Sequence, residues 1–333
     1  MANYLVTGCA GFIGSAVSMA LLKRGDRVFG VDELNDYYSP KLKKWRLHQL
    51  YYQADNTSQF LFANDLSLIT FGMRRIKESF PADAILHFAA YPGVRRSMED
   101  PELYVRNNVI DSIRVLKAAK EFGIPRVFMA SSSSVYGDNA TLPDRDTIEP
   151  VHEMFLPLYQ LSPYSASKRM MEHLASIYAD TYDMNITVAR YFTVYGPAGR
   201  PDMAYLKFID QISRGEAITV YGDGEQRRDM TYISDAVEAT LKMIGLDGFN
   251  VINIGTGYPV SLNKVISIIG CSLDICPQIE HEPAQPGESR VTCASIERAE
   301  TLLGWKPTVR IEEGIERTVE WYNEVGKDLL REE

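Results

Sequence analysis

The chain has 333 residues, of which 45% are hydrophobic and 24% charged, so it can bury a large core in one composite domain or two closely joined ones. Its formal net charge of -9 argues against nucleic-acid and anionic-membrane partners, because those partners bind basic surfaces. No run reaches the ~18 apolar residues that a membrane span needs, and the first residues enter a strand without a signal-peptide pattern. Four cysteines without zinc-ligand spacing predict reduced thiols, no metal site and a cytoplasmic protein.

Short apolar and β-branched runs alternate with helical patterns over residues 1–190. This alternation predicts an α/β fold with a doubly wound parallel sheet of the Rossmann type, which binds its ligand at the carboxyl edge. Parallel strands need crossovers, so we expect helices at Ser15 to Arg24, Pro101 to Phe122 and Pro163 to Asp180. The predicted strands are residues 4–7, 27–32, 60–64, 84–89, 126–131 and 186–191.

The glycine-rich segment Thr7 to Gly14 follows the first predicted strand and opens the first predicted helix. Its spacing is G-x-x-G-x-x-G, which lets a pyrophosphate approach the backbone and the helix N-terminus, although a tight structural turn is the alternative. The predicted cofactor contacts in this turn are Gly8, Gly11, Phe12, Ile13 and Gly14.

Asp32 ends the second predicted strand, 18 residues after Gly14. A carboxylate there can accept hydrogen bonds from both ribose hydroxyls and repels a 2′-phosphate, which favours NAD over NADP. A solvated acid at the start of a loop is the alternative. Asp65 and the adjacent Leu66 follow the third strand and are candidates for the adenine end of the cofactor, with a helix N-cap as the alternative for Asp65.

Four serines, Ser131 to Ser134, stand at the end of the predicted strand 126–131, where sheets of this kind hold ligands. Hydroxyls in a row are poor strand formers, and a polar loop is the alternative. Tyr164 and Lys168 lie four residues apart on one face of a predicted helix, which indicates a general base beside an ammonium that lowers its pKa. A surface helix would show the same spacing.

The regular alternation of strands and helices ends after residue 190, where glycine- and proline-rich loop patterns at 196–201 and 222–224 separate shorter predicted strands. We therefore predict an NAD-binding domain at 1–190 and a smaller substrate-binding lobe at 191–333. The apolar run 251–255 reads as one more buried strand. We expect the lobe to be interleaved with the first domain and to return to the sheet near residues 230–256.

In this order, the glycine turn, Asp32, the serine run and the Tyr164/Lys168 pair resemble the extended short-chain dehydrogenase/reductase family acting on nucleotide sugars. The resemblance covers essentially the whole chain. It implies that Ala89, Ala90 and Asn108 contact NAD, that Ser132 holds the reacting hydroxyl with Tyr164, and that the protein is a homodimer. The further motifs are His87 to Ala90, Gly222 to Ile233 and Leu303 to Pro307.

Three stretches resemble the UDP-glucuronate 4-epimerases within that family: Leu34 to Tyr38, Pro92 to Ser97 and Arg190 to Ala204. The resemblance implies a UDP-sugar substrate epimerised at carbon 4 through a 4-keto intermediate with bound NAD. Decarboxylases of this kind usually carry Glu at position 134, and 4,6-dehydratases carry Asp-Glu at positions 133 and 134, but neither acid is present here. A neutral-sugar 4-epimerase, a UDP-glucuronate decarboxylase and a non-catalytic NAD-binding regulator are the alternatives.

The same resemblance suggests which residues hold the nucleotide sugar. Arg228 is expected at the pyrophosphate, and Arg200 is a candidate to close over the nucleotide. Gln285 to Glu288 replaces a stretch that in relatives often has an arginine, and Arg290 is a candidate substitute. The full set of predicted substrate contacts is Arg95, Ser132, Ser133, Ser134, Tyr164, Thr193, Arg200, Arg228 and Arg290.

Overall fold

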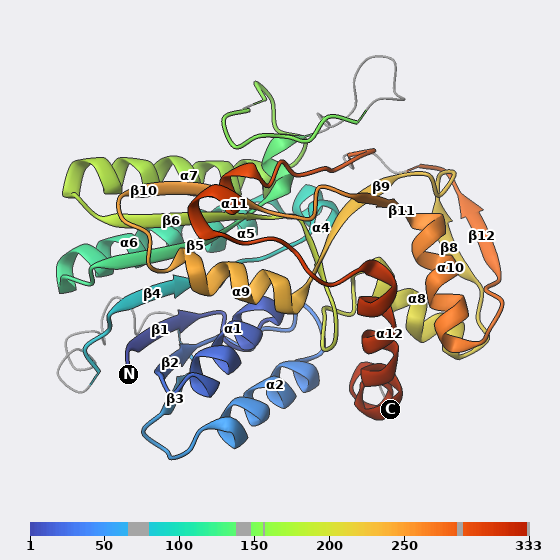
Figure 1. The fold of residues 1–333 in the computed structure, drawn as a ribbon, viewed down its shortest axis with the longest axis horizontal. Coiled ribbons are helices and arrows are strands. Elements are labelled where there is room, and N and C mark those ends of the chain that lie inside the picture. Colours follow the sequence, from blue (N-terminus) through green and yellow to red (C-terminus); the bar gives the residue numbers. More distant parts are fainter. Residues whose placement is uncertain (66–79, 138–147, 156, 285–288, 332–333) are drawn as a thin grey trace.

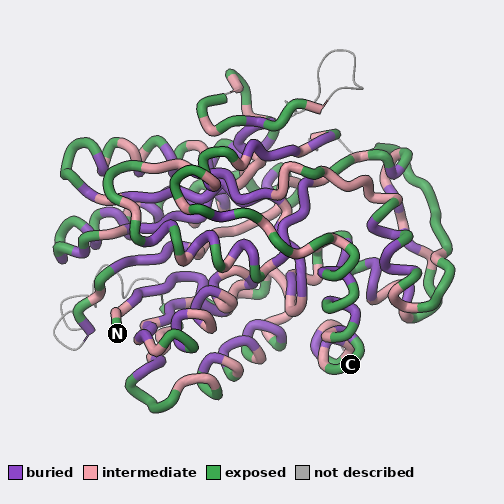
Figure 2. The backbone as a smooth tube through the Cα atoms, viewed as in Figure 1, coloured by how far each residue is buried: buried purple, intermediate pink, exposed green. Residues whose placement is uncertain are grey.

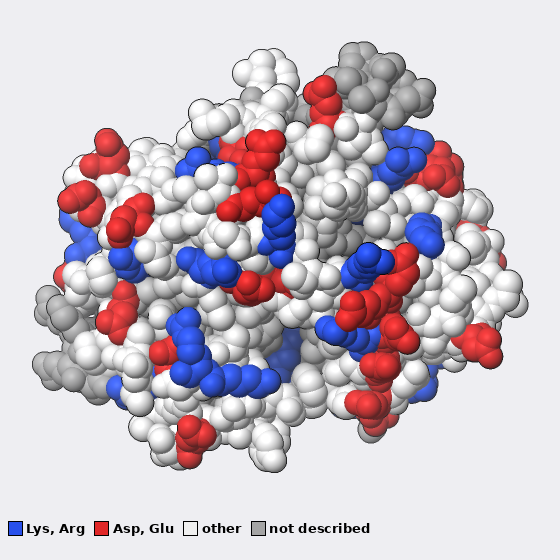
Figure 3. Space-filling view, viewed as in Figure 1, with Lys and Arg blue, Asp and Glu red and all other residues white. Residues whose placement is uncertain are grey.

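The computed structural model describes residues 1–65, 80–137, 148–155, 157–284 and 289–331. Leu66 and the stretch 285–288 therefore lie outside the described residues. Within the described part, no helix has the length and apolar character to cross a membrane. On the face shown in Figure 3, basic and acidic side chains are interspersed.

A parallel sheet of seven strands forms the centre of the molecule (Figure 1), in the order β10-β6-β5-β4-β1-β2-β3. All six strands predicted from the first 190 residues belong to it, which confirms the doubly wound α/β fold. The order reverses beside β1, as expected for a sheet built outward from its first strand. The strands are β1 (Asn3–Thr7), β2 (Arg27–Val31), β3 (Phe60–Ala63), β4 (Ala84–His87), β5 (Arg126–Ser132), β6 (Asn185–Tyr191) and β10 (Phe249–Ile254).

Helices cover both faces of this sheet and leave its strands buried (Figure 2). One apolar cluster joins α1, α2 and α9 to the sheet, and a second joins α6 and α7 to the opposite face. Sheets with two covered faces read as continuous apolar runs, as these strands do. The helices are α1 (Phe12–Lys23), α2 (Pro40–Gln53), α4 (Val94–Glu99), α5 (Pro101–Tyr104), η2 (Val105–Ile110), α6 (Asp111–Phe122), η3 (Ser133–Tyr136), α7 (Pro163–Tyr182) and α9 (Ile233–Met243).

A smaller lobe with its own apolar cluster lies beyond the carboxyl edge of the sheet. It contains a three-stranded sheet, β11-β9-β7, and a two-stranded sheet, β12-β8. Because β10 lies in the large sheet, the chain crosses between the lobes more than once, and the domain boundary at residue 190 stays a prediction. The elements are β7 (Thr193–Tyr195), α8 (Ala204–Ser213), β8 (Ile218–Tyr221), β9 (Arg227–Tyr232), β11 (Pro259–Ser261), α10 (Leu262–Leu273), β12 (Ile279–Glu282), α12 (Ile311–Trp321), η4 (Tyr322–Gly326) and α13 (Lys327–Leu330). Helix α11 (Glu297–Leu303) instead packs against β10 and α9 at the central sheet.

Helix α2 forms a joint between the two lobes. Trp45 on α2 meets Trp321 at the end of α12, with ring centroids 6.2 Å apart and the rings close to edge-on. Aromatic pairs favour such edge contacts. Residues far apart in the sequence are thus held together where α2 meets the end of α12.

Asp229 on β9 is a second junction, and its carboxylate is fully buried. It accepts hydrogen bonds from the backbone N–H groups of Thr256 (2.6 Å), Gly257 (2.9 Å) and Ala294 (2.9 Å), and from the Thr256 hydroxyl (2.7 Å). A buried charge is tolerated only when such bonds replace its water. Asp229 therefore ties three chain segments of the smaller lobe to one point.

We expect Asp229→Ala to lower the free energy of unfolding by about 3 kcal/mol or more, because three buried N–H groups lose their acceptor. Urea unfolding followed by circular dichroism measures the change. Asp247→Ala is the matched control, since this carboxylate is 82% exposed and pairs with Arg126 at the surface, and it should change stability by less than about 0.5 kcal/mol. Equal free energies of unfolding for the two variants would contradict a stabilising role of the buried Asp229 carboxylate.

Candidate active site

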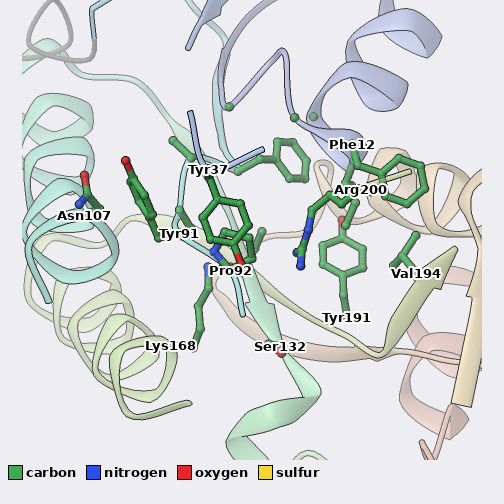
Figure 4. Close-up of a pocket in the computed structure, with 18 of the residues that line it drawn as sticks. Phe12, Tyr37, Tyr91, Pro92, Asn107, Ser132, Lys168, Tyr191, Val194 and Arg200 are labelled. Atoms are coloured by element: carbon green, nitrogen blue, oxygen red, sulfur yellow. Dashed lines mark hydrogen bonds between the residues drawn. The ribbon is translucent and has the colours of Figure 1, made fainter. Parts of the chain in front are cut away.

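A cavity of about 330 Å³ opens at the carboxyl edge of the central sheet (Figure 4). Its walls come from the glycine turn after β1, the end of β2, the segment after β4, the serine run after β5 and the segment after β6. This is the place where doubly wound sheets bind ligands. The structure therefore brings the predicted cofactor turn and the predicted catalytic residues to one cavity.

The glycine turn packs so closely that side chains cannot replace its glycines. Gly8 has φ +71°, and a Cβ atom there would lie 2.7 Å from the backbone nitrogen of Ala89. A Cβ on Gly14 would collide with the carbonyl oxygen of Gly8. Helix α1 begins at Phe12 without a side-chain cap, which leaves its first N–H groups for a ligand. These residues fit a pyrophosphate.

Asp32 lies at the cavity wall, where backbone hydrogen bonds hold its carboxylate. The two oxygens accept from the N–H groups of Ala10 at 3.0 Å and Leu34 at 2.9 Å. Asp65, by contrast, is exposed at the end of β3 and does not line the cavity. Of the predicted acids, Asp32 is the one that the structure places beside the glycine turn.

Ala89 and Ala90 line the cavity, whereas Asn108 lies behind its wall. The Asn108 amide accepts from the N–H of Tyr91 at 2.7 Å and donates to the carbonyl of Tyr91 at 3.0 Å. The side chain that does line the cavity is its neighbour, Asn107, which Figure 4 shows beside Tyr91. The sequence pattern did not single out Asn107 because only the π-helical turn of η2 decides which asparagine faces the cavity.

Helix α7 positions Tyr164 and Lys168 in its first turns. Proline at 163 starts the helix, and Ser162 and Ser165 form a reciprocal capping box that fixes where it begins. Tyr164 then reaches the cavity that Ser132 also lines, and the Ser132 hydroxyl lowers the pKa of the phenol. The predicted catalytic residues Ser132, Tyr164 and Lys168 thus share one wall.

The cation that lowers the pKa of Tyr164 differs from the sequence expectation. Burial raises this pKa, while the Ser132 hydroxyl and the Arg200 guanidinium lower it. Lys168 instead donates to the carbonyl of Ala130 at 2.7 Å, and burial lowers its own pKa to about 8 against the pull of Glu172. Arg200 is therefore an electrostatic partner of the phenol across the cavity.

A buried polar network that the sequence analysis missed lies beneath the serine run. Glu172 accepts from the Ser131 hydroxyl at 2.6 Å and from two nitrogens of Arg190 at 2.9 and 2.7 Å. Arg190 also donates to the Tyr136 hydroxyl at 2.8 Å, and that hydroxyl donates to Asn253 at 2.6 Å. The sequence signal was present, since Glu172 stands four residues after Lys168 on the same helix face.

A second cavity of about 620 Å³ adjoins the first and extends toward the smaller lobe. Both cavities are lined by Tyr37, Ser133, Thr193 and Met203, so they share a wall. Ser134 also lines the second cavity, and its hydroxyl is buried without a hydrogen-bond partner among the described residues. A buried hydroxyl without a hydrogen-bond partner destabilises the folded protein unless a bound ligand supplies that partner. Three predicted substrate contacts, Ser133, Ser134 and Thr193, thus line this second cavity.

The predicted arginines surround this second cavity unevenly. Arg228 lines it and donates to the carbonyl of Arg290 at 3.3 Å, while Arg95 lies over the ring of Tyr221 at 4.8 Å. Arg290 pairs with Asp223 at 3.0 Å and lines neither cavity.

Arg200 reaches into the first cavity, between Tyr37 and Tyr191 in Figure 4. Its guanidinium is held by two hydrogen bonds to the carboxylate of Asp202, at 3.0 and 2.7 Å. Burial opposes the charge, but this carboxylate raises the pKa of Arg200, so the guanidinium stays cationic beside Tyr164.

Comparison with known proteins gives consistent matches. Residues 4–255 match the NAD dependent epimerase/dehydratase family. The chain is 40% identical to a UDP-glucuronate 4-epimerase of Thermodesulfobacterium geofontis over 97% of each chain. It superposes with a TM-score of 0.86 and 34% identity on a UDP-glucuronic acid 4-epimerase from Bacillus cereus in complex with UDP-glucuronic acid and NAD, covering 97% of this chain and 99% of that one. A UDP-glucose 4-epimerase from Thermotoga maritima gives a TM-score of 0.85 at 29% identity, covering 96% and 98%.

The position of Asp32 predicts the choice of dinucleotide. NAD should bind at least about tenfold more tightly than NADP, because the carboxylate repels a 2′-phosphate. Asp32→Ala should narrow that ratio, while Asp247→Ala, far from the cavity, should leave it unchanged. Calorimetric titration of each protein with both dinucleotides provides the measurement, and equal affinities in the parent would remove Asp32 from this role.

Proposed function

Because this chain belongs to the NAD dependent epimerase/dehydratase family, we propose that it interconverts UDP-glucuronate and UDP-galacturonate by inverting carbon 4 of the sugar. The observation that carries the proposal is the group of hydroxyls beside Tyr164. Ser133 and Thr193 line both cavities, Ser134 lines the second, and the Ser134 hydroxyl is buried without a partner in the described structure. Similarity to UDP-glucuronate 4-epimerases over nearly the whole chain supports the same substrate.

The first cavity holds NAD in this proposal. The glycine turn takes the pyrophosphate and Asp32 the ribose hydroxyls. When bound, NAD accepts a hydride from carbon 4 of the sugar and later returns it. The other proposed contacts with the cofactor that line this cavity are Ala89, Ala90, Tyr164 and Lys168. Of the remaining predicted contacts, Asp65 does not line the cavity, Asn108 supports its wall through Tyr91, and Leu66 lies outside the described residues.

Tyr164 is the proposed general base and acid for the 4-hydroxyl of the sugar. Free tyrosine titrates near pH 10, and burial raises the pKa of Tyr164 further, so the phenolate needs support. Ser132 and Arg200 supply that support, because both lower the pKa. Ser132 can also share the reacting hydroxyl with the phenol. A non-catalytic role fits poorly with this arrangement.

The second cavity holds the nucleotide sugar. Arg228 is the proposed contact for the pyrophosphate, since a guanidinium binds phosphate through charge-assisted hydrogen bonds. Arg95, which lines the same cavity, and Arg200 are proposed to hold the nucleotide from the side of the first lobe. Arg290 is proposed to support this contact, because its carbonyl accepts a hydrogen bond from Arg228 although Arg290 lines neither cavity.

The hydroxyl wall addresses a specific hazard of a sugar acid. Oxidation at carbon 4 of glucuronate makes a β-keto acid, which loses carbon dioxide when the carboxylate bond aligns with the ketone. Neutral donors such as Ser133, Ser134 and Thr193 can hold the carboxylate by charge-assisted hydrogen bonds and fix its orientation. An acid at 133 or 134 could not hold it, and neither position carries one.

Two adjacent helical segments carry the surface proposed for a homodimer. Helix α7 exposes Met170 (50%) and Ile177 (56%) two turns apart on one face, and η2 exposes Val105 (47%) and Ile110 (40%). These segments pack side by side. An exposed apolar stripe on paired helices favours a self-complementary two-fold contact. The protein is also proposed to work in the cytoplasm, where its four free cysteines stay reduced.

Incubation with UDP-glucuronate should yield UDP-galacturonate, and faster than UDP-glucose is converted. Tyr164→Phe should lower turnover at least ~100-fold, because general acid–base groups contribute about that much. Chromatographic separation of the epimers measures both rates. Faster conversion of UDP-glucose by the parent would overturn the assignment of the sugar acid, and a variant keeping a tenth of the turnover would exclude Tyr164 as the base.

Ser134→Glu should slow epimerisation of UDP-glucuronate and release some carbon dioxide, because a second negative charge pushes the substrate carboxylate out of its protected orientation. The pentose nucleotide or its 4-keto precursor would appear by mass spectrometry. Ser134→Gln is the matched control, with similar size and no charge, and should form less of it. If both variants epimerise glucuronate normally, the hydroxyl wall does not hold the carboxylate.

A further inference from the structure

Arg46 on α2 is a buried arginine, with 2% of its surface exposed. Its guanidinium donates to the carbonyls of Ala10 (2.9 Å), Ala198 (2.6 and 3.1 Å) and Gly199 (3.0 Å) and to the hydroxyl of Tyr38. These bonds engage all three of its nitrogens. A buried guanidinium is stable only when its donors are satisfied in this way.

No carboxylate in the described part of the chain forms an ion pair with Arg46. Its partners are carbonyl and phenol oxygens from three separate segments. At this buried position water cannot take the place of these oxygens. If the three segments moved apart, the guanidinium would therefore lose hydrogen bonds without replacement. Arg46 therefore links backbone segments to one another and does not serve a local ion pair.

One of the linked segments is the glycine turn of the cofactor cavity. Ala10 stands between Gly8 and Gly11, and its peptide groups are held from both sides. Its N–H donates to Asp32 at 3.0 Å and its carbonyl accepts from Arg46 at 2.9 Å. The shape of the turn that would receive the cofactor pyrophosphate thus depends directly on Arg46.

The other linked segment carries Arg200, which follows Ala198 and Gly199 directly. Ala198 has φ +55°, an unfavourable angle for a residue with a side chain, and a Cβ on Gly199 would collide with the Tyr205 hydroxyl. Such a conformation persists only where neighbours enforce it. Arg46 holds both carbonyls of this bend and so determines where Arg200 enters the cavity.

We infer that Arg46 is a positioning residue that couples the cofactor turn to the Arg200 loop, so that NAD and a uridine nucleotide each strengthen the binding of the other. The inference rests on the proposed function only in taking these two ligands. Coupling between two binding sites is reciprocal. If a uridine nucleotide at the Arg200 loop strengthens the binding of NAD at the glycine turn, then NAD strengthens the binding of the uridine nucleotide by the same factor. The coupling suits a reaction in which the oxidised sugar must stay until the cofactor has reduced it again.

The test measures how fast bound NAD leaves the protein, with and without saturating UDP. In the parent, UDP should slow the release of NAD at least about fivefold, within the range of couplings found in proteins. Arg46→Lys keeps the charge, but a single ammonium nitrogen cannot donate to all three segments as the planar guanidinium does. In this variant UDP should therefore slow the release of NAD less than about twofold. Arg46→Gln serves if the lysine variant does not fold.

Arg24→Lys is the matched control, since Arg24 is also hydrogen-bonded, to Asp26 and Tyr4, but lies at the opposite edge of the sheet. It should retain the full effect of UDP on NAD release. A parent in which UDP leaves NAD release unchanged, or an Arg46 variant with the parental ratio, would overturn the inference. If both ligands bind with coupling but UDP-glucuronate is not epimerised, the proposed function fails and the role of Arg46 stands.

Discussion

The arrangement of the catalytic wall depends on one desolvated ion pair, between Glu172 and Arg190. Both side chains are at least 97% buried, and their bonds reach β5 through Ser131 and β10 through Tyr136 and Asn253. A buried pair contributes little net stability compared with apolar residues of the same size, but it is costly to disrupt. Its effect here is geometric. It fixes helix α7, which carries Tyr164 and Lys168, against the strand that ends in the serine run.

The two cavities beside this wall are lined by different chemical groups. The first is bounded by backbone turns and by Asp32, whose carboxylate is held by two backbone N–H groups, and it suits a large, rigid dinucleotide. The second is bounded by hydroxyls and arginines, and it suits an anionic ligand that must turn over while bound. Ser133 and Thr193 line both cavities, so this shared boundary is where ligands of the two cavities can meet.

The sequence predicted the parts of the site that depend on local pattern. The strand positions, the glycine turn, Asp32 and the spacing of Tyr164 and Lys168 all follow from periodicity, turn chemistry and helix geometry. It did not predict the parts that depend on contacts between distant segments. Arg46 reaches residues 152 positions away, and the exchange of Asn108 for Asn107 at the cavity arises from a π-helical turn that has no sequence signature.

The joint between α2 and α12 has an optical consequence. The chain has three tryptophans, and two of them, Trp45 and Trp321, form this joint, while Trp305 is fully buried beside α11. Indole fluorescence that responds to the relative position of the lobes therefore originates from the contact between Trp45 and Trp321. The protein carries an intrinsic fluorophore at the element that also bears Arg46, so movements of α2 can be followed in solution without attaching a dye.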